Sequence, residues 1–190
     1  MIRKENPYDA ELILHSYNVG IVAKAIGDAM KIEHCNLFHL GLLHDVGKIF
    51  IPKKILNKPS RLNFEEFENM KRHSEFSEWI VCSEYLDEDE GEIYSKIIRH
   101  HHENWDGTGY PDNLLGNSIP VESRILTVAD VFDAMITPRI YRNFSIPNVI
   151  EIMESEVGRK FDPEIFKIAK PILISRMNEL SKEKNYPKAY

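Results

Sequence analysis

The apolar residues of this chain repeat at intervals of three and four along most of its length, which is the period of α-helices with one buried face. The clearest run includes Val19, Val22, Ala23 and Ile26 and predicts a long helix over about residues 8–31. The alternating pattern of paired strands is found nowhere convincing. The sequence therefore favours an all-α protein built as a helical bundle.

The same period predicts further helices, separated by loops. These helices cover residues 37–46, 64–84, 93–102, 121–137 and 146–157, with a last one that starts at 162. Asn63 and Glu66 have the spacing of a capping box, and Pro171 is expected to kink or divide the last helix. The expected loops are residues 48–62, an acidic turn over 84–92, and the glycine- and proline-containing segment 103–120. A loop as long as 103–120 in a compact domain usually has a functional role.

Length and charge narrow the class of protein. The 190 residues carry 24 basic and 30 acidic side chains, a net charge of -6, which argues against binding of polymeric nucleic acid through a basic face. No apolar run is long enough for a membrane span, and the first residues lack the apolar core of a signal peptide. Cys35 and Cys82 form no CxxC motif. We expect one cytoplasmic domain.

Several histidines stand beside carboxylates on predicted helices. His44 precedes Asp45, Glu11 and His15 are one helical turn apart, and His73, His101, His102 and Asp130 follow on later segments. Any one of these alone is more often an ordinary core or surface residue. Together they give each of several helices an imidazole or carboxylate, the way bundle proteins build metal centres. No chemistry is assigned to His34, His39 and His100.

Longer motifs around these residues resemble the HD-GYP domain, a branch of the HD phosphohydrolases that degrades cyclic di-GMP. They include His44-Asp45-Val46-Gly47-Lys48, His101-His102-Glu103-Asn104-Trp105-Asp106-Gly107-Thr108-Gly109-Tyr110-Pro111 and Val128-Ala129-Asp130-Val131-Phe132-Asp133-Ala134. The His-His-Glu and Gly-Tyr-Pro elements are far more specific than the His-Asp pair. The resemblance implies an HD-type helical bundle with a long Gly/Pro-containing loop near the active site. It would occupy residues 1–190 as a single domain, with a core over about 8–167 and a C-terminal helical extension over about 168–190.

The resemblance also implies a metal centre of two or three divalent ions, most often iron and alternatively manganese. The expected ligands are Glu11, His15, His44, Asp45, His73, His101, His102 and Asp130, with Asp45 bridging two ions. Members with a third ion have a glutamate in the place of Glu11. Mixed imidazole and carboxylate ligands suit iron, manganese or zinc.

Four residues are expected to act on the substrate by the same resemblance. Lys48 would contact the scissile phosphate, and Arg139 and Arg142 would hold the substrate's phosphates, since a guanidinium can bond two oxygens at once. Tyr110 would either stack on a guanine base or pack the loop. Pro138 departs from the family pattern beside Arg139 and changes the backbone that presents it.

The implied activity is hydrolysis of cyclic di-GMP to linear pGpG and then to GMP, with Asp45 and Lys48 as catalytic residues. One alternative is a phosphodiesterase for another cyclic dinucleotide, such as a cyclic GMP–AMP hybrid. A different class of protein is a catalytically weak module that senses the nucleotide or docks a diguanylate cyclase through the Gly-Tyr-Pro loop. A homodimer is also compatible with the resemblance.

Overall fold

The computed structural model describes residues 7–84, 88–137 and 149–182, and this part of the chain is helical. The elements are α1 (Pro7–Met30), α2 (Leu37–Leu43), η1 (Val46–Phe50), α3 (Lys53–Leu56), α4 (Phe64–Lys71), α5 (His73–Glu84), α6 (Glu88–Arg99), η2 (Gly116–Ser118), α7 (Val121–Ile136), α8 (Val149–Ser155) and α9 (Pro163–Lys182). Among the described residues, β-pairing is limited to two isolated bridges. The all-α expectation is confirmed.

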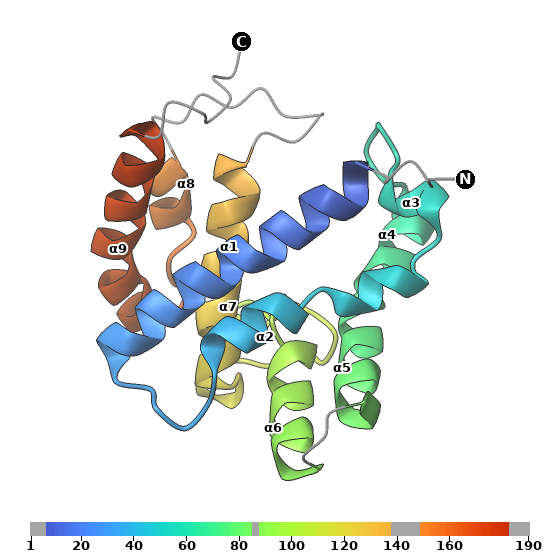
Figure 1. Cartoon of the computed structure of the whole chain (residues 1–190), viewed down its shortest axis with the longest axis horizontal. Helices are drawn as coiled ribbons and strands as arrows, with labels where there is room; N and C mark the ends of the chain where they lie inside the picture. Colours follow the sequence, from blue (N-terminus) through green and yellow to red (C-terminus); the bar gives the residue numbers. More distant parts are fainter. Residues whose placement is uncertain (1–6, 85–87, 138–148, 183–190) are drawn as a thin grey trace.

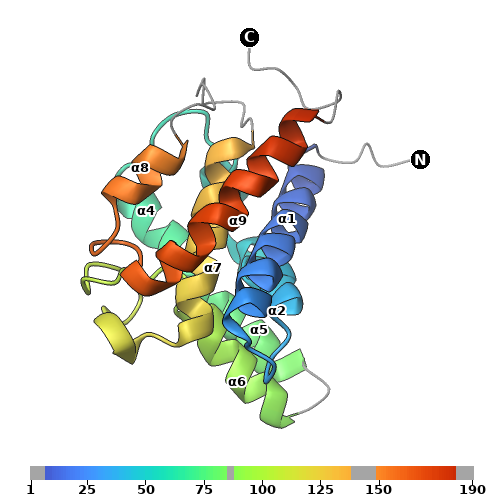
Figure 2. The same cartoon turned by 90° about the vertical axis from the view of Figure 1, so that its left-hand side faces the viewer.

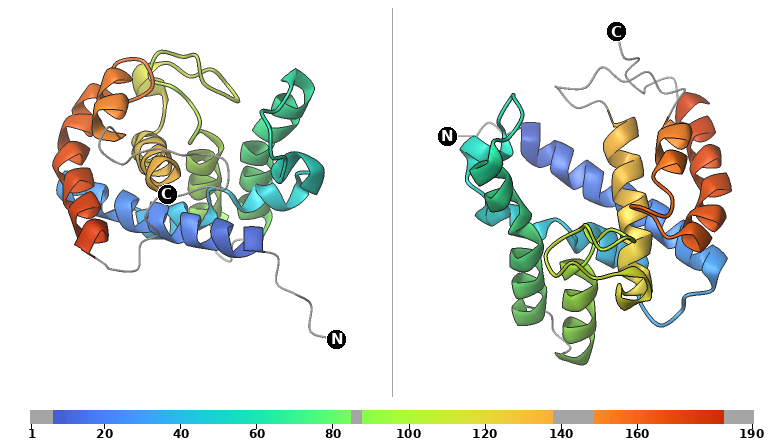
Figure 3. Two further views of the ribbon diagram at one scale, coloured as in Figure 1. Left: turned by 90° about the horizontal axis from the view of Figure 1, so that it is seen from above. Right: turned by 180° about the vertical axis from the view of Figure 1, so that it is seen from behind.

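The core of the bundle lies where α1, α7 and α9 pack together (Figures 1 and 2). Ile26, Phe132 and Leu173 come from these three helices and are fully buried. Burying a side chain of this size contributes about 1.5–3 kcal/mol. Seen from above in Figure 3, α3 to α5 lie on one side of α7, and α8 and α9 lie on the other.

Two glycines let α1 and α2 cross with their backbones in contact. A Cβ on Gly41 would lie 2.4 Å from the Cα of Gly20, and a Cβ on Gly20 would lie 2.7 Å from the carbonyl oxygen of Phe38. No larger residue fits this crossing without moving a helix. The crossing brings the middle of α1, with His15, close to the end of α2, which leads into His44.

The longest predicted helices agree with the structure. The helix predicted over 8–31 is α1, the one over 121–137 is α7, and the last helix starts at Pro163 as expected. Asp162 caps α9 by accepting a hydrogen bond from the Glu164 amide at 2.8 Å. Pro171 does not divide α9. Both Pro171 and the residue four positions earlier are exposed, so water can bind the carbonyl that the proline leaves without a donor.

The helix predicted over 64–84 is wrong as one element, because α4 ends at Lys71 and α5 begins at His73. The capping box predicted at its start is confirmed, with Asn63 and Glu66 bonded to each other's amides. At the break, His73 Nδ1 donates a hydrogen bond to the Met70 carbonyl oxygen, and the Ser74 hydroxyl donates one to the Lys71 carbonyl oxygen. Side chains thus occupy acceptors that a continuous helix would need.

Other boundaries also differ. The helix predicted over 37–46 ends at Leu43 and gives way to η1, and the loop predicted over 48–62 contains α3. The acidic turn predicted over 84–92 is helical from Glu88 onward, since acidic residues favour the first turn of a helix. The predicted helix over 146–157 is seen as α8, and its first three residues lie outside the described ranges. None of the described helices is long and apolar enough to cross a bilayer.

Candidate metal centre

Seven of the eight sequence-predicted ligands converge in the middle of the bundle. Within the described residues they form two groups, each with donor atoms no more than 4.8 Å apart: Asp45, His73, His101 and His102 in one, and His15, His44 and Asp130 in the other. They come from α1, the turn after α2, the start of α5, the turn after α6 and the middle of α7. Most are almost completely buried. Residues distant in the sequence are thus brought to one place.

Three of the histidines bond to the same kind of backbone partner, and this hydrogen bond fixes their tautomer. In each, Nδ1 lies 2.6–2.7 Å from the carbonyl oxygen three residues earlier: His44 with Gly41, His73 with Met70, and His101 with Ile98. A carbonyl can only accept, so Nδ1 must carry the hydrogen. The Nε2 atom of each neutral ring therefore presents a lone pair to the centre.

These lone pairs face each other and face carboxylate oxygens. His73 Nε2 lies 3.4 Å from His101 Nε2 and 3.3 Å from Asp45 Oδ1. His44 Nε2 and Asp45 Oδ1 are buried without a hydrogen-bond partner. Acceptors at this distance repel, and unpaired buried polar atoms are costly. A cation between them would remove both penalties, so this donor set fits divalent metal ions.

Lowered pKa values keep the imidazoles of His73, His101 and His102 neutral. Burial, together with the nearby His44 and His73, lowers the pKa of His101 to about 3. Burial is also the main cause that lowers the pKa of His73 and of His102. Burial alone would raise the pKa of Asp45, but the Lys48 ammonium and His44 hold it well below its usual range. Neutral imidazoles and an ionised carboxylate are the forms that bind metal.

Asp45 lies between the two groups. Its Oδ1 faces His73 at 3.3 Å, and its Oδ2 faces His44 at 3.3 Å and His15 at 3.7 Å. Each carboxylate oxygen thus addresses a different group of ligands. This geometry is compatible with the expected bridging role of Asp45. Lys48 pairs with Asp45 Oδ2 and is largely buried, so its ammonium also lies at the centre.

Asp133, to which the sequence analysis assigned no role, orients His15. His15 Nδ1 donates to Asp133 Oδ2 at 2.6 Å, while His15 Nε2 lies 3.1 Å from Asp130. Burial opposes the charged ring, but these two carboxylates raise the pKa of His15 to about 9. A carboxylate behind a ligand histidine is typical of metal sites. The i,i+3 spacing of Asp130 and Asp133 on one helix was the signal that could have found it.

A close contact between η1 and α5 holds Asp45 beside His73. The Gly47 amide donates to Ser77 Oγ at 2.8 Å. A Cβ on Gly47 would lie 2.2 Å from the His73 carbonyl oxygen and 2.4 Å from the Ser77 amide nitrogen. Only glycine lets the two backbones approach this closely. The glycine of the His-Asp motif therefore sets the distance between two ligand-bearing segments.

The glycine-containing loop over 103–120 is tied to the same centre. The buried Glu103 carboxylate accepts from the amides of Asp112 and Leu114 at 2.7 and 3.1 Å. Asp112 in turn accepts two bonds from Arg99 and one from His100, and Arg99 and then His100 hold its pKa below its usual range. The loop is thus held by Glu103 through its backbone amides and by Arg99 and His100 through the Asp112 side chain. Its position does not depend on solvent-exposed contacts alone.

Tyr110 packs against His102, one of the predicted ligands. Its ring lies 4.8 Å from the His102 ring, centre to centre, and the Lys71 ammonium lies 5.7 Å above it. Burial raises the pKa of Tyr110. Of the two roles expected for Tyr110, packing of the loop is the one seen here. Its contact with a substrate base stays a prediction.

One predicted ligand is not brought to the centre, and two predicted substrate contacts lie outside the described residues. Glu11 is exposed on α1 and is absent from the donor groups of the described residues, so its role as a ligand of a third ion stays a prediction. Arg139 and Arg142 lie outside the described residues. Their contacts with substrate phosphates also stay predictions.

Comparison with known proteins places these observations in a family. The sequence model described as "HD domain" matches residues 8–165. The chain is 37% identical over 153 residues to the cyclic di-GMP phosphodiesterase response regulator RpfG of Xanthomonas campestris, covering 78% of this chain and 39% of that protein. It is 37% identical over 130 residues to 3'3'-cGAMP-specific phosphodiesterase 2 of Vibrio cholerae, covering 66% of this chain and 24% of that protein.

A solved structure agrees on the fold. The protein Bd1817 of Bdellovibrio bacteriovorus, titled an HDG"Y"P protein, superposes with a TM-score of 0.66 at 20% identity. The match covers 86% of this chain and 52% of that one. The chain spans less than half the length of the curated relatives named above.

Proposed function

The chain belongs to the HD domain family, in its HD-GYP branch, and on that premise we propose that it is a metal-dependent phosphodiesterase of cyclic dinucleotides. The observation that carries the proposal is the set of buried Nε2 lone pairs and carboxylate oxygens that face one another. Such a set suits metal binding, and His44 Nε2 and Asp45 Oδ1 within it are buried without a hydrogen-bond partner. The preferred substrate is cyclic di-GMP.

The ligands are His15, His44, Asp45, His73, His101, His102 and Asp130, with Glu11 added if a third ion binds. The family resemblance favours iron first and manganese second, and mixed imidazole and carboxylate ligands suit both metals. Bound divalent ions would supply Lewis acidity, which lowers the pKa of water and offsets the charge on phosphate oxygens. Hydrolysis adds the oxygen of water to one phosphorus and releases the 3′ oxygen with a proton, which gives linear pGpG and, in a second round, GMP.

The chain's own residues contribute position and charge. Asp45 holds the two ligand groups at a fixed separation, and Asp133 keeps His15 in the tautomer whose Nε2 faces the centre. The Lys48 ammonium, already at the centre through Asp45, is available to an oxygen of the scissile phosphate. Arg139 and Arg142 are proposed to bind the other phosphate.

Specific relatives favour a second substrate. The cyclic GMP–AMP enzyme of Vibrio cholerae is as similar to this chain as the cyclic di-GMP enzyme of Xanthomonas, so a cyclic GMP–AMP hybrid is the alternative. A catalytically weak sensing or docking module would have no need of these buried ligands. Docking of a diguanylate cyclase and formation of a homodimer stay predictions.

The test uses protein purified without oxygen and loaded with ferrous iron or manganese. Each dinucleotide is added separately, the products are resolved by chromatography, and bound metal is counted on the same sample. We expect turnover with two or three ions per chain. His44→Ala should lose metal and turnover together, whereas His39→Ala, which replaces an exposed histidine of the preceding helix α2, should keep both. A metal-loaded protein that cleaves neither dinucleotide would contradict the proposal.

Arg139 is tested on the same assay. If its contact with phosphate is equally strong in the ground and transition states, Arg139→Ala raises KM and leaves kcat unchanged. If neither constant changes, the side chain does not reach the substrate, as the departure at Pro138 would explain.

A further inference from the structure

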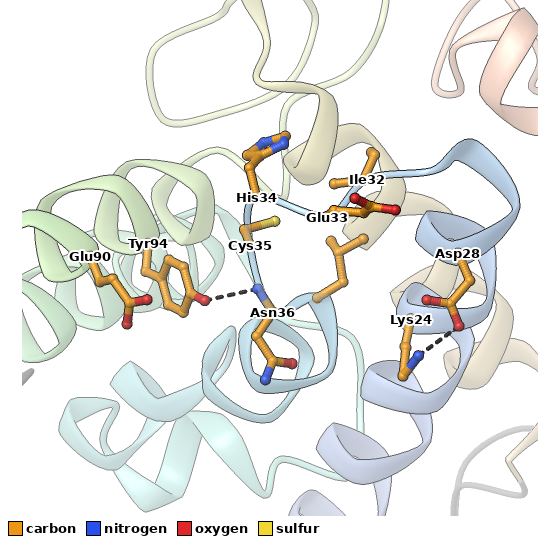
Figure 4. Close-up of a pocket in the computed structure, with 10 residues that line it drawn as sticks. Lys24, Asp28, Ile32, Glu33, His34, Cys35, Asn36, Glu90 and Tyr94 are labelled. Atoms are coloured by element: carbon orange, nitrogen blue, oxygen red, sulfur yellow. Dashed lines mark hydrogen bonds and ion pairs between the residues drawn. The ribbon is translucent and has the colours of Figure 1, made fainter.

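A third group of metal-binding side chains lies outside the candidate centre. His34 and Cys35 belong to the segment that links α1 to α2, and Glu122 lies in the first turn of α7. His34 Nε2 is 2.5 Å from Glu122 Oε1, and the donor atoms of all three residues lie within 4.8 Å of one another. The three share no residue with the seven ligands described above. Figure 4 shows His34 and Cys35 at the edge of a neighbouring pocket.

Burial gives this group the character of a built site. Glu122 is 6% exposed, whereas the His34 side chain is 65% exposed. The carboxylate is thus held inside the fold, and the imidazole closes it off from solvent. A buried carboxylate needs a positive partner. A divalent ion offsets the charge of such a carboxylate more completely than one hydrogen bond from an imidazole does.

The surroundings of the group favour a cation. The neighbouring pocket has a volume of about 530 Å³, and its charged wall is formed by Lys24, Asp28, Glu33 and Glu90. Lys24 is paired with Asp28 at 2.6 Å, so the wall is net negative. Clefts lined by one sign of charge concentrate ions of the opposite sign.

We propose that His34, Cys35 and Glu122 bind one sulfur-preferring divalent ion, of the zinc class, with water in the fourth position. Imidazole nitrogen, thiolate sulfur and carboxylate oxygen are the three ligand types of zinc, and three protein ligands with an open fourth position form a familiar zinc geometry. The ion replaces the proton of Cys35. Without the ion, burial and then the charge of Glu122 raise the pKa of that thiol to about 11, so it is not a reactive thiolate.

The bound ion would restrict the relative movement of helices that carry the proposed catalytic ligands. It joins the end of α1 to the start of α7, and these helices carry His15 and Asp130. The same segment is already fixed to α6, because the Asn36 amide donates to the Tyr94 hydroxyl at 2.8 Å. An ion here therefore limits the relative movement of elements that hold ligands, and it takes no direct part in the chemistry.

Cobalt(II) titration of the full chain tests this site separately from the catalytic centre. A cobalt–thiolate bond gives an intense charge-transfer absorption, and the seven ligands of the candidate centre include no cysteine. We expect the final absorption to correspond to one thiolate-bound cobalt ion per chain, to be lost in Cys35→Ser and to weaken in His34→Ala. Because the His34 side chain is 65% exposed, its replacement opens no cavity in the core.

Two controls decide the assignment. Cys82→Ser removes the chain's other cysteine, which is exposed on α5, and should leave the absorption unchanged. His44→Ala damages the catalytic centre and should also leave it unchanged, so failure here and failure of the proposed function are distinguishable. No thiolate absorption in the wild-type protein, or an absorption that survives Cys35→Ser, would overturn the proposal and leave His34 and Glu122 as an ion pair only.

Discussion

Gly47→Ala is the substitution whose effect can be worked out most directly from the structure. The added Cβ would lie 2.2 Å from the His73 carbonyl oxygen and 2.4 Å from the Ser77 amide nitrogen, where ordinary contacts are 3.4–4 Å. Both neighbours are backbone atoms of α5 and cannot rotate away. Segment η1 must therefore move from α5 by about 1 Å, since a packed interior has no room to absorb the methyl group.

The expected cost has two parts. Overpacking of this kind lowers the free energy of unfolding by about 1–3 kcal/mol, which for a chain of this size lowers Tm by roughly 2–12 °C. The same shift moves Asp45 away from His73, and a displacement of about 1 Å at a reacting centre can reduce turnover about 100-fold. Metal content should fall together with turnover, because both ligands hold the same ions.

The assays are thermal unfolding, metal analysis and turnover on one preparation. Gly27→Ala is the matched control, since its Cβ would meet the Leu37 Cδ1 atom at 2.0 Å. That atom is the tip of a flexible side chain and can move, and alanine favours the helix by about 1 kcal/mol. We expect the control to keep metal and activity. If Gly47→Ala also keeps its Tm and its metal, the contact between η1 and α5 does not position Asp45.

Three further changes test other parts of the structure. Asp133→Asn removes the charged acceptor of His15, so metal affinity should fall about 10–100-fold in competition with a chelator; unchanged affinity would mean that Asp133 does not orient the ring. Asp112→Asn tests the pH dependence of stability: Arg99 lowers the pKa of Asp112, so its contribution is present above about pH 4 and is lost as the pH falls below it. The urea midpoints of variant and wild type should therefore differ at pH 7 and converge in acid, and a constant difference would refute this. Glu11→Ala should reduce the metal count from about three to about two if a third ion binds, and an equal count in both proteins would make Glu11 an ordinary exposed residue.

The sequence predicted the long helices and the ligands for different reasons. Helices α1 and α7 could be predicted because their apolar period runs for several turns, and the ligands because the motifs around His44 and His101 are specific. The break between α4 and α5 could not, because residues 64–84 have helical composition throughout. The break depends on the hydrogen bond from the His73 ring to the Met70 carbonyl, which orients His73 toward the candidate metal centre.

The sequence also could not predict contacts between residues that lie far apart in the chain. His34 and Glu122 are 88 positions apart, and no local pattern connects them. The motif that contains Asp133 was recognised, but its function depends on the packing of α1 against α7. For these residues, the sequence showed that the side chain could bind a metal or accept a hydrogen bond. Only the fold showed which residue it contacts.

The spread of the ligands along the chain has a consequence for folding. His15 and its partner Asp133 are 118 positions apart, so an ion held between α1 and α7 closes a loop that includes most of the protein. A cross-link around a loop of about 100 residues removes about 4–5 kcal/mol of conformational entropy from the unfolded chain. Each bound ion therefore acts as a long-range covalent tie would. On the proposed function, removal of the ions would therefore lower the stability of the fold and the turnover together.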